Sequence, residues 1–109
     1  MDTADLRDFV EFEEGGAHSR EVFGSTRLAA RVISVDVNRA YGPAGHPEAD
    51  AMLVILAGEA VFQVDRRRKR MEQWGSVLVE AGHEVVVTNA SGEPLVLLLI
   101  SAPPNDRRE

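Results

Sequence analysis

The sequence contains no cysteine. Disulfide bonds, zinc–thiolate sites, iron–sulfur clusters and thiol nucleophiles are therefore all excluded. Long apolar runs are missing too, because the longest, Leu95 to Ile100, is far shorter than the ~20 residues of a membrane-spanning helix. The acidic start Met1–Asp5 lacks the basic and apolar segments of a secretory signal. From these absences we expect a cytoplasmic protein with no membrane partner.

Positive charge is scarce in this chain. It has 12 basic and 18 acidic residues, and a net charge of −6. Because nucleic-acid recognition begins with positive potential, a nucleic-acid partner is not expected. The exception is the basic run from Arg66 to Arg70, which we place in an exposed hairpin turn after Asp65. Such a run either keeps a strand end soluble, pairs with the acidic N-terminus of a partner, or forms a patch for an anion or a nucleic acid.

The chain is long enough for one compact domain, with 109 residues. Residues 2–14 are strongly acidic, and the spacing of Leu6 and Phe9 predicts a short N-terminal helical turn. We therefore treat 1–109 as a single domain with an N-terminal extension over 1–19, a β-barrel core over 20–101 and a tail over 102–109.

The rest of the chain has the pattern of short β-strands separated by turn residues. Apolar and polar alternation, or short apolar runs bounded by glycine, predicts strands over 27–37, 51–57, 60–64, 77–79, 85–88 and 95–100. No amphipathic helical stretch separates them, which argues against a parallel α/β sheet. We predict an all-β fold, an antiparallel double-stranded β-helix or jelly-roll barrel with a short N-terminal extension.

Two of the predicted strands, 51–57 and 95–100, are apolar on both faces. A strand with one face in water should alternate instead. The second face must therefore be covered, and a second copy of the chain would cover it in a homodimer. The alternative is that the N-terminal extension folds over it.

Two motifs lie between Gly42 and Ser101. The first contains His46 and Glu48, continues into an apolar strand and closes at Gly58, and the second contains Gly82 and Asn89. In their frame these motifs resemble the two motifs of the cupin family, and His46 falls in the slot of the second histidine of the first motif. The resemblance implies the barrel fold predicted above.

Most metal-ligand slots of that resemblance hold other residues. Ala44 stands in the first histidine slot, Ala51 in the glutamate slot and Val85 in the histidine slot of the second motif. Since a mononuclear metal site needs about three protein ligands, we predict no cofactor. A rearranged divalent-metal site would have to be built from His46, Glu48 and His83. Alternatively, His83 lies in a solvated turn.

The resemblance also implies where a ligand would lie. It places His46 at the barrel interior, where a neutral imidazole can act as a catalytic acid or base, or bind a ligand, without a metal. Alternatively, His46 is a plain loop histidine after Gly45. Glu48 is close enough in sequence to partner it, and Tyr41 precedes the loop at the pocket rim. The expected apolar pocket walls are Ala51, Leu53, Ile55, Val85 and Val87.

Three functions follow as hypotheses. The first is a protein that binds a small molecule in the barrel interior, with metal-independent isomerase, dehydratase or lyase chemistry as its extension. The second is a metal-dependent cupin enzyme, a dioxygenase or isomerase, with displaced ligands. The third is a non-catalytic dimeric module that senses a ligand. Whether the protein is an enzyme stays open at this point.

Overall fold

The structure is a computed structural model that describes residues 1–12 and 14–104. Its elements are, in order, η1 (Leu6–Phe9), β1 (Ala17–Gly24), β2 (Ala29–Val35), β3 (Ala40–Ala44), β4 (Asp50–Ala57), β5 (Ala60–Val64), β6 (Arg67–Met71), β7 (Ser76–Val79), β8 (Val85–Asn89) and β9 (Leu95–Ala102). No helix in the described ranges is long or apolar enough to cross a membrane.

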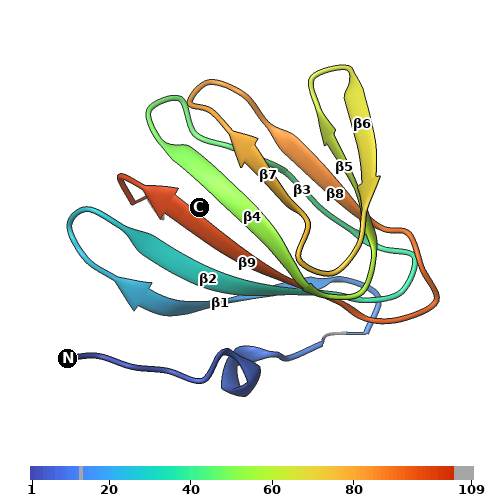
Figure 1. Cartoon of the computed structure of the whole chain (residues 1–109), viewed down its shortest axis with the longest axis horizontal. Coiled ribbons are helices and arrows are strands. Elements are labelled where there is room, and N and C mark those ends of the chain that lie inside the picture. Colours follow the sequence, from blue (N-terminus) through green and yellow to red (C-terminus); the bar gives the residue numbers. More distant parts are fainter. Residues whose placement is uncertain (13, 105–109) are drawn as a thin grey trace.

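The strands form two antiparallel sheets (Figure 1). One has five strands in the order β1-β2-β9-β4-β7, and the other has four in the order β3-β8-β5-β6. This is the predicted all-β antiparallel jelly-roll, and the prediction is confirmed.

The inner faces of the two sheets share one hydrophobic core. Residues of a strand alternate between faces, so one parity of each strand points inward. Fully buried Leu, Ile and Val side chains contribute about 1.5–3 kcal/mol each relative to exposure. The inward set comprises Ile33, Val35, Leu53, Ile55, Ala60, Phe62, Val79, Val85, Val87, Leu95 and Leu97.

The sequence pattern missed β3. This strand contains Gly42 and Pro43, and a Gly-Pro pair is typical of a turn between strands. It pairs with β8 only at Ala40, Tyr41 and Ala44, and its register shifts across the two intervening residues. Because β3 is an edge strand, the bulge accommodates a proline that has no N–H for a ladder.

The predicted turn over residues 65–70 is wrong in extent. Only Asp65 and Arg66 lie between β5 and β6, and Arg67–Met71 is a strand whose first four residues are exposed. Asp65 adopts φ 57°, a left-handed conformation that aspartate tolerates in a two-residue hairpin. A run of five basic residues has no alternation that predicts a strand. Its strand conformation comes from pairing with β5.

The N-terminal extension folds onto the outer face of β1 and β2 (Figure 1). Its helical turn is confirmed as a single 3₁₀ turn, Leu6–Phe9. The Glu11 N–H donates to the hydroxyl of the fully buried Ser34 at 3.1 Å. Arg20, on the same face of β1, lies 5.2 Å from the ring centroid of Phe9. The extension therefore covers one half of this sheet.

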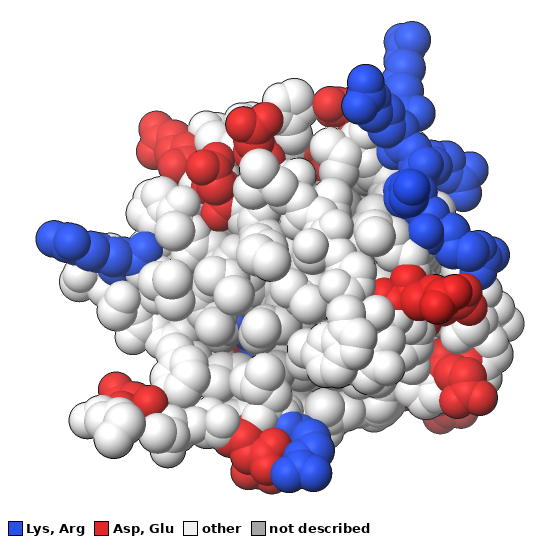
Figure 2. Space-filling model, viewed as in Figure 1, with Lys and Arg blue, Asp and Glu red and all other residues white. Residues whose placement is uncertain are grey.

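The other half of that outer face is not covered by the extension. Cross-strand pairing aligns Leu78, Met52 and Ile100 on it, and Met52 and Leu78 are 43% and 61% exposed. Figure 2 shows a broad area without charged side chains on the face where Figure 1 shows β4, β7 and β9. We call this area the β4–β7 face.

Candidate functional site

The three replaced ligand slots lie at the barrel interior. Ala44 is opposite Val85 in the β3–β8 ladder, and both belong to the core or pack against it, as does Ala51 on β4. None of these side chains offers a nitrogen or oxygen donor. No group of three His, Cys, Asp or Glu side chains that could hold a metal gathers within residues 1–12 and 14–104. The donor set present therefore does not fit a mononuclear metal.

The residues expected to form pocket walls fill the core. Leu53, Ile55, Val85 and Val87 are at most 1% exposed and pack within one cluster. Ala51 and Tyr41 contact that cluster from its margin. The structure thus brings these side chains together, but as parts of a packed core and not as the walls of a pocket.

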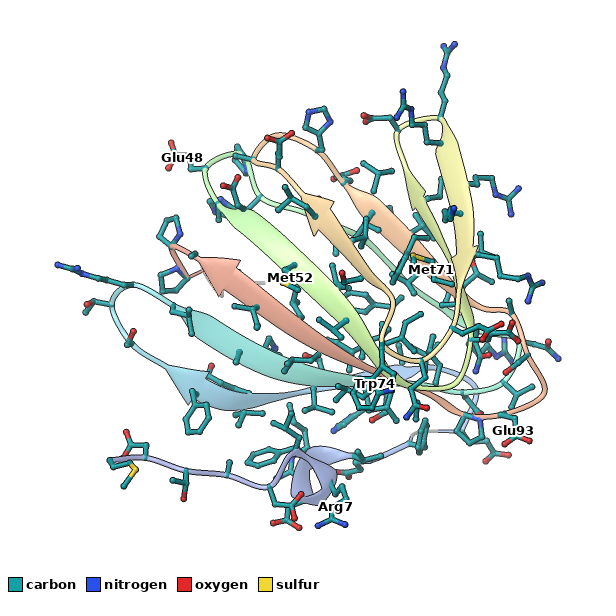
Figure 3. The ribbon with its side chains drawn as sticks, in the orientation of Figure 1. Arg7, Glu48, Met52, Met71, Trp74 and Glu93 are labelled. Atoms are coloured by element: carbon teal, nitrogen blue, oxygen red, sulfur yellow. The ribbon has the colours of Figure 1, made fainter. Side chains whose placement is uncertain are left out.

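His46 lies in the connection between β3 and β4. Its backbone carbonyl accepts the N–H of Gly82 at 2.9 Å, and its ring Nδ1 accepts the N–H of Glu48 at 3.0 Å. A ring nitrogen that accepts a hydrogen bond carries no proton, so the neutral imidazole of His46 has its proton on Nε2. Glu48 contributes its backbone here, and its exposed side chain points away from the barrel (Figure 3).

His46 lines a surface hollow of about 460 Å³, which we call the His46 hollow. Gln63 and Val86, which line it too, are opposite each other in the β5–β8 ladder on the outer face of the sheet. His83 lies in the same hollow, with its Nδ1 3.0 Å from a carboxylate oxygen of Asp65. Because an ionised carboxylate only accepts, Nδ1 of His83 donates, and its Nε2 is left as an acceptor. The hollow thus combines a proton donor with a proton acceptor.

A second cavity, of about 610 Å³, lies where β1, β2, β3 and β9 meet. Arg31 is on the inner face of β2, and its Nε–H donates to the Ser19 hydroxyl at 2.6 Å. Arg31 Nη1 is also 3.5 Å from a carboxylate oxygen of Glu21. These side chains are 38% and 55% exposed, so the pair is open to solvent. We call this the Arg31 cavity, and its lining further includes Tyr41, Ala29, Leu99, Ser101 and Pro104.

Solved structures that resemble this chain share its architecture. No family model matches the sequence, and no curated protein does. A protein from Thermus thermophilus is 24% identical with a TM-score of 0.88, covering 94% of this chain and 98% of its own. An RmlC-like cupin from Desulfovibrio desulfuricans is 18% identical with a TM-score of 0.85, covering 96% and 99%. A cupin superfamily protein from Desulfitobacterium hafniense is 20% identical with a TM-score of 0.77, covering 89% and 86%.

The chain has the fold of the small cupins. In this fold the residues shared with the two motifs have backbone and packing roles. Asn89 is 2% exposed and its amide bonds four backbone groups, and Gly82 holds φ +90°. These structural roles explain why the two motifs are still recognisable in the sequence, although three of their metal-ligand positions hold other residues.

Apart from Tyr41, the polar residues of the Arg31 cavity were not predicted from the sequence. One signal was available, because Arg31 shares the parity of Ile33 and Val35, which lie on one face of the predicted strand. A charged residue on the inner face of a strand marks a cavity or an edge. Ser19 and Glu21 carried no such signal, because β1 is recognisable in the sequence only at its apolar pair, Val22 and Phe23.

Proposed function

We propose that this cupin-like protein binds a small, hydroxyl-rich organic molecule in the Arg31 cavity. The observation that supports this most is the Arg31–Glu21 pair on the inward side of the barrel, beside a core that is otherwise apolar. The two charges pair with each other, and because the pair is open to solvent it can also meet the polar groups of a ligand.

The chemistry of the lining defines the ligand class. The guanidinium of Arg31 supplies donors and the carboxylate of Glu21 supplies acceptors, so their charges balance. The hydroxyls of Ser19 and Ser101 can do both. Leu99 and other apolar groups line the same cavity and would pack against a carbon skeleton. A molecule with several hydroxyl groups on a short carbon skeleton can both donate to and accept from these groups, whereas a purely apolar ligand could form no hydrogen bonds with them.

A second candidate function is metal-independent proton transfer at the His46 hollow. It is favoured by the complementary ring tautomers described above, with His46 Nε2 as donor and His83 Nε2 as acceptor. Asp65 would orient His83 and stabilise its protonated form. This pair would serve the isomerase, dehydratase or lyase chemistry expected from the sequence.

The test is a thermal-shift screen with monosaccharides, sugar acids and polyols on matched variants. We expect hits on the wild type to lose their response in Arg31→Gln. The response should persist in Arg27→Gln, which removes an exposed arginine outside the cavity, and in His46→Gln. A response that survives Arg31→Gln and disappears in His46→Gln would instead place the ligand in the His46 hollow. No response to any hydroxylated compound would reject the proposed ligand class.

We also infer that the functional unit is a homodimer joined through the β4–β7 face. An apolar face of this kind is uncommon on a monomer. The extension covers only the β1–β2 half, so the alternative cover does not reach Met52 and Leu78.

Light scattering on charge-insertion variants tests the dimer. Wild type should have twice the mass of one 11.9 kDa chain at micromolar concentration. Met52→Lys should give the monomer mass, and Leu28→Lys, at an equally exposed apolar position outside this face, should remain dimeric. A wild type with the mass of one chain would refute the inference.

A further inference from the structure

The two sheets are not joined on the side of β6 and β7. Each of these strands is the last of its sheet, and no ladder connects them in the part of the chain that the structure describes. A cleft of about 750 Å³ lies between them, on the side of the sandwich opposite β1 and β3. Its apolar lining includes Phe62, Val64, Met71 and Val77, and Figure 3 shows Met71 in the space between β6 and β7.

Two cations of the basic run face this cleft. In the β5–β6 ladder Lys69 is opposite Phe62, and Arg67 is opposite Val64. Residues directly opposite in an antiparallel pair share a face, so both cations lie on the inward side of the sheet. Arg70 is opposite Val61 and therefore points outward, where it pairs with Glu59 at 3.7 Å.

The inward cations have no carboxylate partner among the described residues. Within residues 1–12 and 14–104 neither Arg67 nor Lys69 forms an ion pair, and the same holds for Arg68 at the cleft. Asp65 also lines the cleft, but its carboxylate bonds His83. Unpaired positive charge beside an apolar floor is complementary to a molecule with a negative head and an apolar body.

We propose that this cleft binds a carboxylate with an apolar chain, such as a medium-chain fatty acid. The chain would lie on Val64, Met71 and Val77, which are partly exposed in the cleft, and the carboxylate would meet Arg67 and Lys69, with charge-assisted hydrogen bonds to the guanidinium. A single-stranded nucleic acid fits less well, because it needs an exposed aromatic ring for stacking and Phe62 is 3% exposed. This site is separate from the Arg31 cavity and does not depend on it.

Octanoate is the probe, and binding is measured by NMR titration of the full chain. We compare two double variants that each remove two charges from the same run. Arg67→Gln/Lys69→Gln removes the inward pair, and Arg66→Gln/Arg70→Gln removes two cations that do not line the cleft. Both change exposed side chains, and their amide spectra show whether the fold is retained.

Octanoate should shift the signals of Val64, Met71 and Val77, and octan-1-ol should bind more weakly. The affinity for octanoate should fall about tenfold in the inward double variant, since two ion pairs are lost, and stay near the wild-type value in the other. Equal weakening in both variants would show only diffuse attraction and would overturn the proposal. So would an absence of shifts at the cleft in folded wild type at millimolar octanoate.

Discussion

Replacing Asn89 by alanine should destabilise the domain severely. This side chain is 2% exposed at the end of β8. Its amide nitrogen lies 3.2 Å from the carbonyl oxygen of Val35, 3.3 Å from that of Asp36 and 2.8 Å from that of Glu93. Its carbonyl oxygen accepts the N–H of Ser91 at 3.1 Å. Asn89 therefore ties the end of β2 to the turn before β9.

The expected cost follows from these bonds. An amide NH₂ has two hydrogens, so it makes two full bonds among the three carbonyl groups. A buried polar group left without a partner costs about 1–3 kcal/mol, and we expect Asn89→Ala to lose about 2–4 kcal/mol. In a domain of this size that lowers the melting temperature by about 10 °C or more.

Urea and thermal denaturation on two variants separate the donor role from packing. Asn89→Asp keeps the shape but has no hydrogen to donate when ionised, so it should be less stable than Asn89→Ala at neutral pH. Its deficit should shrink as the pH falls and the carboxyl gains a proton. A loss below about 1 kcal/mol in Asn89→Ala, with Asn89→Asp no worse, would refute the reasoning.

Three further predictions concern other parts of the structure. Gly82→Ala should lower the free energy of unfolding by about 1–2 kcal/mol through its positive φ alone, because a Cβ there meets no other atom within 4 Å. Gly58→Ala should lower it more, because its Cβ would also lie 2.7 Å from the Pro94 carbonyl oxygen. Chemical denaturation tests this, and equal losses in the two variants would contradict it. Hydrogen bonds from the N–H groups of Gly15 and then Val37 lower the pKa of Asp36, so its ionised form stabilises the fold above pH ~4 and loses this effect as the pH falls through the lowered pKa. Asp36→Asn should accordingly be less stable than wild type at pH 7, and the gap should close in acid; a gap that is constant with pH would be the contrary result. Elemental analysis of the purified protein should find far less than one metal ion per chain, and one equivalent that His46→Ala abolishes would contradict this.

The fold was predictable because its strongest sequence signals are the ones that build the core. The alternation over 60–64 and the apolar runs over 51–57 and 95–100 became β5, β4 and β9 with small changes at their ends. The missed strands, β1, β3 and β6, all lie at the edge of a sheet. Edge strands tolerate proline, bulges and charge, so local propensity does not identify them.

The candidate sites were less predictable for a different reason. The sequence placed His46 by its motif slot, but the side-chain direction of a loop residue depends on its local bonds, here the N–H of Glu48 to the ring. The Arg31 cavity and the β6–β7 cleft depend on which strands meet in space. Arg31 depends on its neighbours Ser19 and Glu21 in β1, a strand that the sequence did not predict. Lys69 faces the cleft because β6, which was predicted as a turn, pairs with β5.

The most direct test of the proposed binding function is a crystal structure of the protein soaked with the strongest hydroxylated hit from the thermal-shift screen. We predict density for the compound between Arg31, Glu21 and Tyr41, with the guanidinium in hydrogen-bond contact with a ligand oxygen. Density in the His46 hollow, with an empty Arg31 cavity in the same crystal, would contradict the account.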